Sequence, residues 1–157
     1  MKRWIMILLT IGLTSLASAS GRQPEVIDDY DVVIYGATSA GVTAAIQVQA
    51  MGRTAVIVEP GQHVGGLTSG GLGSTDTGNK AVVGGLSREF YRRIKKYYDD
   101  PQVWRYESQA DYARYRPQDD AMWTFEPHVA ESILRHMLEE SGARVFFGER
   151  LQRKNGV

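Results

Sequence analysis

The chain has 157 residues, with 18 basic and 18 acidic side chains, 43% apolar residues and no cysteine. This apolar fraction is ordinary for a folded domain and speaks against disorder, while the lack of cysteine removes disulfide scaffolds and cysteine-ligated metal sites. A formal net charge of zero gives no support to a nucleic-acid-binding domain, and the length suits one domain or part of a larger one.

The first 19 residues have the pattern of a secretory signal peptide. Lys2 and Arg3 precede an apolar run over residues 4–16, and Ala17-Ser18-Ala19 offers small residues where a signal peptidase cleaves. The run of 13 residues is shorter than the ~20 that a transmembrane helix needs, so a membrane anchor is the weaker interpretation. Cleavage after Ala19 would leave a secreted or periplasmic chain of 138 residues, with no membrane association and slightly more acidic than basic side chains.

The pattern that follows predicts a β-α-β unit. Residues 20–29 are polar and predict a linker. Residues 30–35 form a near-continuous β-branched and aromatic run, which is typical of a strand buried on both faces of a parallel sheet. Residues 42–51 are rich in alanine and free of proline, and Gly52 follows as a stop signal, so they predict a helix. Residues 54–58 predict a second buried strand.

The middle of the chain is rich in glycine and then in aromatic residues. Residues 61–85 hold nine of the 17 glycines and predict a loop. Apolar side chains recur at helical spacing over residues 86–98 and predict a helix. Its basic residues are interpreted as a solvated face rather than an anion site: Arg92, Arg93, Lys95 and Lys96. Residues 99–124 have poor periodicity, and a short helix is expected around residues 109–115.

The last part of the chain predicts a helix followed by strands. Pro127 suits the first position of a helix, and Gly142 suits its end. Residues 144–147 predict a third strand and residues 150–154 another. Asn155-Gly156 is a hairpin turn signal.

The turn after the first predicted strand is similar to the dinucleotide fingerprint G-x-G-x-x-G. It reads Gly36-Ala37-Thr38-Ser39-Ala40-Gly41, with Thr38 at the second glycine position. Gly36 permits a tight turn, Gly41 lets helix and strand pack closely, and backbone N–H groups near Ser39, Ala40 and Gly41 would point at a pyrophosphate. The Thr38 Cβ would hold the backbone farther from the phosphate, although its hydroxyl could donate a hydrogen bond instead.

Glu59 lies at the end of the second predicted strand, 23 residues after Gly36. An acid there can accept hydrogen bonds from both ribose hydroxyls of an adenosine, and its charge would repel the 2′-phosphate of NADP. A nucleotide-free α/β turn is the plainer alternative. The glycine run over residues 65–73 favours a long cofactor such as FAD, because glycines allow close backbone approach and offer N–H groups to anionic oxygens.

Three segments resemble the N-terminal region of bacterial FAD-dependent oxidoreductases of the glutathione-reductase-like flavoprotein group: residues 35–41, 59–61 and 65–73. Residues 125–131 are similar to a further segment of a secreted branch, and the resemblance covers residues 30–157. It implies an α/β fold, a Rossmann-like FAD-binding domain with a parallel sheet. In that family the FAD domain is discontinuous, so the chain would be an N-terminal fragment, truncated before the substrate domain.

The resemblance also implies residue roles. The start of the predicted helix would line the FAD pyrophosphate, Glu59 would hold the adenosine ribose, and the backbone at Leu151 would touch adenine. Gly65 and Gly66 would pass beside the cofactor, and residues 68–71 would run toward the flavin. The full predicted cofactor-binding set is Gly36, Thr38, Ser39, Ala40, Gly41, Glu59, Gly65, Gly66, Thr68, Ser69, Gly70, Gly71 and Leu151.

Residues that are missing narrow the chemistry. Thr68 and Ser69 stand where flavin disulfide reductases carry a cysteine pair, so thiol–disulfide exchange is excluded for this region. No histidine lies between Val64 and Ala121, so FAD is expected to be non-covalent. His63 is interpreted as a solvated loop residue. Surface positions are also expected for His128 and His136, and no metal site is expected.

The sequence therefore predicts an FAD-dependent oxidoreductase whose flavin accepts a hydride from a small-molecule substrate. No catalytic residue is identified in this chain, and the fragment is expected to be inactive alone. The alternatives are an inert fragment, or an NAD-binding or other nucleotide-binding Rossmann module without flavin chemistry. Two interpretations stay open for the aromatic residues Trp104, Tyr106, Tyr112, Tyr115, Trp123 and Phe125: stacking on a sugar or a flavin, or covering the core.

Overall fold

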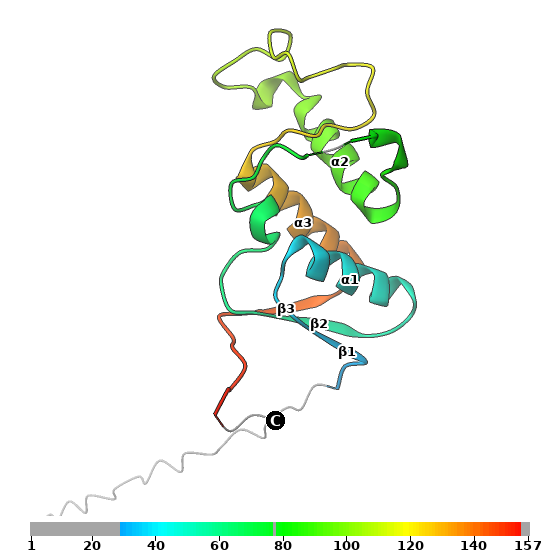
Figure 1. The fold of residues 1–157 in the computed structure, drawn as a ribbon, viewed down its shortest axis with the longest axis vertical. Coiled ribbons are helices and arrows are strands. Elements are labelled where there is room, and N and C mark those ends of the chain that lie inside the picture. Colours follow the sequence, from blue (N-terminus) through cyan, green and yellow to red (C-terminus); the bar gives the residue numbers. More distant parts are fainter. Residues whose placement is uncertain (1–28, 77, 155–157) are drawn as a thin grey trace, which may run out of the picture.

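The computed structural model describes residues 29–76 and 78–154 (Figure 1). The predicted signal peptide and the predicted hairpin turn at Asn155-Gly156 therefore lie outside the described residues, as does the predicted linker apart from Asp29. None of the helices in the described part of the chain combines the length and apolar character needed to cross a membrane.

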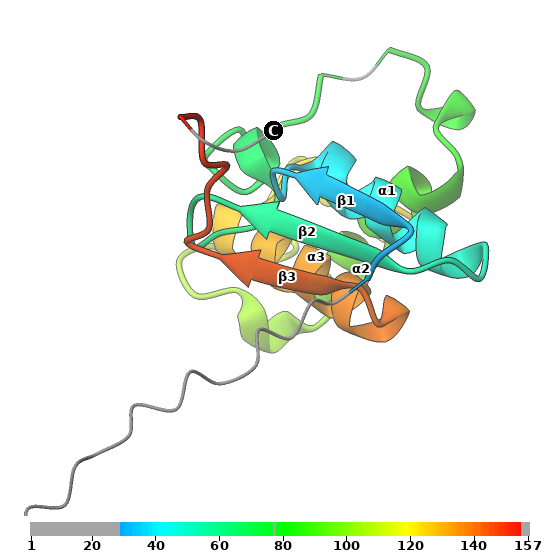
Figure 2. The ribbon, with the colours of Figure 1, turned by 90° about the horizontal axis from the view of Figure 1, so that it is seen from below.

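A parallel three-stranded sheet forms one layer of the fold. Its strands are β1 (Val32–Tyr35), β2 (Ala55–Glu59) and β3 (Arg144–Phe147), in the order β1-β2-β3. Figure 2 shows the three arrows pointing the same way, so that all carboxyl ends meet at one edge of the sheet. The three strands confirm the predicted α/β class with a parallel sheet.

Helices cover a single face of this sheet. α1 (Ser39–Ala50) and α3 (Pro127–Ser141) lie against it, and α2 (Gly85–Tyr98) packs on α3 farther away (Figure 1). All three helices were predicted, and α3 begins at Pro127 and ends against Gly142, whose φ of 77° is left-handed. The core lies between sheet and helices, and its fully buried side chains include Val42, Ile57, Val64, Ile94 and Val129.

The opposite face of the sheet is open, which corrects the prediction of a first strand buried on both sides. Val33 is 65% exposed and Tyr35 50% exposed, and Phe146 of β3 is exposed on the same face. Side chains alternate between the two faces of a strand, so Ile34 and Val145 face the core while these residues do not. No described helix covers that second face (Figure 2), although Val56 of the central strand is buried there and the Arg144 guanidinium donates to the Tyr30 hydroxyl at 2.9 Å.

The glycine-rich loop pairs with the chain just before α3. The Phe125 N–H donates to the Gly73 carbonyl at 2.8 Å and the Thr75 N–H donates to the Trp123 carbonyl at 3.0 Å. This short antiparallel contact fixes the loop on one side. Three short 3₁₀ turns complete the connections: η1 (Gly66–Thr68), η2 (Lys80–Val82) and η3 (Pro101–Val103).

Two predicted elements are wrong. Residues 109–115 form turns instead of a helix. Ser108 and Asp111 hydrogen-bond through side chain and backbone, which competes with a helical ladder. Residues 150–154 are irregular rather than a strand. Just before them, the Gly148 N–H donates to the Gly61 carbonyl and the Glu149 N–H donates to the Glu59 carbonyl.

Candidate nucleotide-binding site

The turn between β1 and α1 forms the capped start of α1. Gly36 has φ of +100°, a left-handed conformation that glycine adopts without strain. Thr38 is the N-cap, and its Oγ1 accepts the Gly41 N–H at 3.1 Å. Gly41 therefore does not offer the free N–H that was predicted for it. The N–H groups of Ser39 and Ala40 have no acceptor within the described residues.

Gly41 holds the helix start against the end of β1. A Cβ at this position would lie 2.2 Å from the Gly36 carbonyl oxygen and 3.3 Å from Cγ2 of Ile34. No side chain fits at such distances, so the close packing predicted for this glycine is present. The packing fixes where the Ser39 and Ala40 N–H groups point.

The Glu59 carboxylate accepts hydrogen bonds from two backbone N–H groups, one just after β1 and one just after β2. Its Oε2 accepts the Ala37 N–H at 2.6 Å, and its Oε1 accepts the Gly61 N–H at 2.6 Å. Each carboxylate oxygen can accept more than one hydrogen bond, so both retain capacity for a ribose hydroxyl. The sequence predicted the ribose interaction. It did not predict the bonds to the Ala37 and Gly61 N–H groups, because these depend on β1 and β2 being neighbours in the sheet.

Gly65 and Gly66 lie directly against the fingerprint turn. The Gly65 N–H donates to the Ala37 carbonyl at 2.7 Å, and both glycines have positive φ, +102° and +55°. A Cβ on Gly65 would lie 2.5 Å from Oγ of Ser69, and one on Gly66 would lie 3.3 Å from Cγ2 of Thr38. The structure thus brings together the two glycine segments that the sequence assigned to one cofactor.

The rest of the predicted set lies around this junction. Thr68 lines a cavity of about 240 Å³ together with Ser39 and Ala40, between the start of α1, η1, α2 and α3. The Ser69 hydroxyl is turned inward and donates to the Val64 carbonyl, whereas Gly70 and Gly71 are exposed. The loop continues from these two glycines to Gly73, whose carbonyl accepts the Phe125 N–H in the short antiparallel contact.

Leu151 is exposed in the tail after β3. The Glu149 N–H donates to the Glu59 carbonyl at 3.3 Å, and the Gly148 N–H donates to the Gly61 carbonyl at 3.0 Å. These two bonds lead the tail along the loop that follows β2, on the Glu59 side of the site (Figure 2). Contact between Leu151 and adenine stays a prediction.

A charged cluster that the sequence did not indicate fixes the loop between Glu59 and Gly65. Glu131 of α3 bonds to Nδ1 of His63 at 2.9 Å and to Arg135 at 2.7 Å, and Arg135 also donates to the Gln62 carbonyl at 2.6 Å. Burial raises the pKa of Glu131, but Arg135 and His63 lower it more, so its pKa lies below the ordinary value. His63 is exposed, as predicted, yet it is paired.

The basic residues of α2 differ from their predicted role in one case. The exposed Arg92 bonds to Asp120, and the half-buried Arg93 bonds to Glu89 and Glu140. Lys95 instead is buried. Its ammonium bonds to Asp99, which corrects the prediction of a solvated lysine. Burial lowers the pKa of Lys95, but hydrogen bonds to Asp99 and Tyr115 raise it above its ordinary value.

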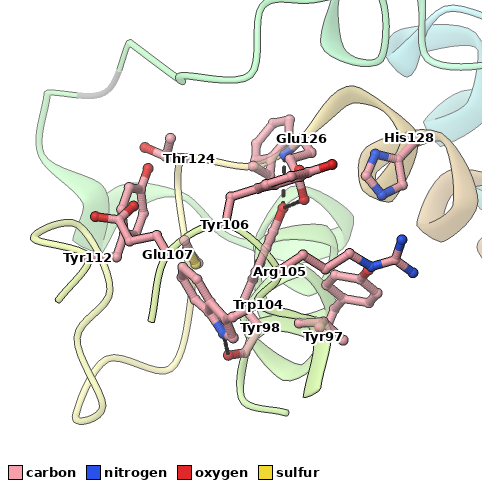
Figure 3. A pocket seen from close by; sticks show the side chains of 13 residues that line it. Tyr97, Tyr98, Trp104, Arg105, Tyr106, Glu107, Tyr112, Thr124, Glu126 and His128 are labelled. Atoms are coloured by element: carbon pink, nitrogen blue, oxygen red, sulfur yellow. Dashed lines mark hydrogen bonds between the residues drawn. The ribbon is translucent and has the colours of Figure 1, made fainter. Parts of the chain in front are cut away.

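The aromatic residues mostly cover the core. Trp123 and Phe125 are buried, and the Trp104 ring packs against Tyr112 and Tyr115 with centroids 5.5 and 5.8 Å apart. Tyr106 is the exception, with 98% of its surface exposed. Figure 3 shows it beside Glu126 in a pocket of about 720 Å³. His128 points toward the same pocket. In the described chain no three His, Asp or Glu side chains come together in a group that could hold a metal ion.

Tyr98 stabilises the wall of this pocket. Its hydroxyl accepts the Glu126 N–H at 2.9 Å and donates to Glu126 Oε2 at 3.1 Å. Burial raises the pKa of the Tyr98 hydroxyl far above its ordinary value, so it stays protonated and able to donate. The Tyr98 carbonyl accepts the Trp104 indole N–H at 3.0 Å, which joins the end of α2 to the aromatic cluster.

Comparison with known proteins gives a family for the chain. Residues 31–155 match the family described as FAD dependent oxidoreductase, and no curated protein matches the sequence. Among solved structures, THI4 from Thermovibrio ammonificans has 20% identity and a TM-score of 0.42, over 81% of this chain and 43% of that one.

The 3-ketosteroid-delta4-(5alpha)-dehydrogenase from Rhodococcus jostii RHA1 has 16% identity and a TM-score of 0.41, over 83% of this chain and 41% of that one. The aromatic hydroxylase CabE has 17% identity and a TM-score of 0.39, over 77% and 24%. The chain spans less than half the length of each of these proteins. Because the family match covers nearly all of the described residues, the chain belongs to the FAD dependent oxidoreductase family, with FAD as its cofactor.

Proposed function

We propose that the chain is the FAD-binding part of a secreted oxidoreductase of the glutathione-reductase-like group, which oxidises a small-molecule substrate. The observation that carries the proposal is the junction of three segments: the capped turn at Thr38, the carboxylate of Glu59, and the Gly65-Gly66 loop. Family membership supports the choice of FAD over NAD.

The residues at this junction fit FAD. Two backbone N–H groups, of Ser39 and Ala40, have no acceptor within the described chain and lie at the start of a 12-residue helix, where the helix dipole favours an anion. Beside them is the cavity of about 240 Å³, and the Gly65-Gly66 loop packs so closely on Ser69, Leu134 and Thr38 that a Cβ on either glycine would crowd those side chains. A dianionic pyrophosphate matches the two N–H groups, and a flat ring system matches the cavity.

Each residue has a distinct part in this proposal. The Ser39 and Ala40 N–H groups donate to the pyrophosphate. Glu59 accepts from the ribose hydroxyls while it keeps its bonds to the Ala37 and Gly61 N–H groups. The backbone of the tail at Leu151 would contact adenine. When bound, FAD supplies the acceptor for a hydride from the substrate.

Non-covalent binding fits the residues that line the loop. Cysteine is missing from the sequence, and its histidines lie outside residues 64–121, so the segment proposed to approach the flavin has no side chain of the usual kinds for attachment. The proposal also keeps the chain as an N-terminal fragment, inactive alone, whose catalytic groups lie elsewhere. The open apolar sheet face with Val33, Tyr35 and Phe146 supports this, because such a face is normally covered.

A proline substitution tests the site by removing one N–H group. Ser39 is the first residue of α1, where proline is well tolerated, and Thr38 before it has the extended conformation, ψ 168°, that a following proline favours. Ser39→Pro should leave the fold intact and weaken FAD binding about tenfold, the effect of losing one charge-assisted hydrogen bond. Ser39→Ala, which keeps the N–H, is the matched control.

Flavin fluorescence quenching measures affinity, and circular dichroism checks the fold. Equal FAD affinity in the proline and alanine variants would show that the helix start does not hold the pyrophosphate. Tighter binding of NAD than of FAD by the unmodified chain would overturn the proposal in favour of a different nucleotide-binding module.

A further inference from the structure

Another pocket, of about 300 Å³, lies at the short strand contact between Ser74 and Thr124, both of which line it. It is bounded by the glycine-rich loop on one side and by residues 113–124 on the other. Its charged lining residues are Lys80, Arg114, Arg116 and Asp119. The buried Trp123 ring contributes to the wall. None of the residues assigned above to FAD lines this pocket.

The pocket carries an uncompensated positive charge. Three of its lining residues are basic and one is acidic, and no ion pair joins any of the four to another described residue. Several other arginines of the described chain do have carboxylate partners: Arg93 has two, and Arg135 bonds to Glu131. An excess of one sign in a concave site attracts counter-ions, and most strongly at low ionic strength.

Arg114 is held in place by neutral groups. Its Nη1 donates to Oγ of Ser74 at 3.1 Å and to Oγ1 of Thr124 at 3.4 Å, one hydroxyl from each paired segment. Hydroxyls orient a guanidinium without neutralising it, so its other N–H groups stay available with the full charge. A fixed guanidinium loses less side-chain entropy on binding a ligand than a free one does.

Lys80 is also placed by its neighbours. Arg88 of α2 donates to the Lys80 carbonyl at 3.0 Å, which anchors this part of the loop. The Lys80 ammonium lies 5.6 Å from the centroid of the Trp123 ring. Lys80 and Arg114 therefore approach the pocket from two separate segments that both contact the same short strand pair.

We propose that this pocket binds the carboxylate or phosphate group of a small molecule. The planar guanidinium fork of Arg114 matches two oxygens of such a group, and Lys80 and Arg116 supply further positive charge. A volume of about 300 Å³ suits a small ligand rather than a polymer. The site is separate from the pyrophosphate site at Ser39 and Ala40, and it does not depend on the assignment of FAD to that site.

Calorimetric titration of the full chain at low ionic strength tests the proposal, with succinate and inorganic phosphate as probes. Binding of either probe is expected, and the tighter one identifies the preferred group. Arg114→Gln and Arg116→Gln should each weaken binding about tenfold. Arg116 donates no side-chain hydrogen bond to the described residues, so its variant tests charge without disturbing the Ser74–Thr124 contact.

Arg105→Gln is the matched control, because this substitution changes the net charge by the same amount. Arg105 is exposed and lines the aromatic pocket of about 720 Å³ instead. It should change affinity less than twofold. The proposal is overturned if neither probe binds, if the control loses as much affinity as Arg116→Gln, or if saturating FAD displaces the probe by simple competition. Binding that persists with FAD present and weakens in both pocket variants supports a separate anion site.

Discussion

Replacing Gly41 with alanine gives a test in which two effects have opposite signs. Within a helix, alanine is more stable than glycine by up to about 1 kcal/mol, so an unhindered position in the first turn of α1 would gain stability. At Gly41 the new Cβ would lie 2.2 Å from the Gly36 carbonyl oxygen, about 1 Å inside contact distance. That oxygen belongs to the backbone, so either the turn or the helix must move.

Overpacking of this kind costs typically 1–3 kcal/mol, and a clash with backbone belongs at or above the upper end. After the helical gain is subtracted, Gly41→Ala should be less stable by about 2 kcal/mol, a large share of the stability of a small domain. Urea unfolding followed by circular dichroism measures this difference. The control is Gly78→Ala, where a Cβ meets nothing within 4 Å, with an expected change within about 0.5 kcal/mol. A Gly41→Ala chain as stable as the original would refute the reasoning from close helix–strand packing.

Three further outcomes are expected. Tyr98→Phe should lower the free energy of unfolding by about 1–2 kcal/mol in urea denaturation, because a backbone N–H loses its hydroxyl acceptor. Arg88 and Arg92 hold the pKa of Asp120 below its ordinary value, so the stabilisation from this group is present above the unfolded pKa and is lost as pH falls through the folded pKa. Asp120→Asn should therefore flatten the acid side of the stability profile, measured as urea midpoints against pH. Mass spectrometry of the chain expressed in a bacterial host should show cleavage after Ala19, and an uncleaved product would contradict the signal-peptide interpretation.

The regular elements near the site were predictable because their signals are local. β-branched runs and the alanine-rich segment indicated β1, β2 and α1, and proline and glycine marked the ends of α3. The segment over residues 109–115 was not predictable in this way. Its conformation depends on turn hydrogen bonds and on the packing of Tyr112 and Tyr115 against Trp104. These three aromatic residues are close in sequence, but their contacts leave no periodic pattern of apolar residues.

Long-range contacts account for most of what the sequence missed. Glu131 and Arg135 reach the loop near His63 across some 70 residues. The buried Lys95 ammonium bonds to Tyr115, 20 residues farther along the chain, as well as to Asp99 one helical turn on. The open face of β1 is a different case. A continuous apolar strand predicts two covered faces, and the described residues supply one layer of helices only.

Thr38 shows how the fold uses a departure from the glycine fingerprint. The sequence offered two outcomes, a backbone held away from the phosphate or a hydroxyl that donates to it. In the structure the hydroxyl oxygen caps the helix at Gly41, and the methyl group packs 3.3 Å from the position of a Cβ on Gly66. Both ends of the side chain are thus engaged within the protein. The Ser39 and Ala40 N–H groups stay without an acceptor among the described residues. Thr38 therefore stabilises the turn and occupies only the Gly41 N–H, while Gly66 of the glycine-rich loop leaves room for its methyl group.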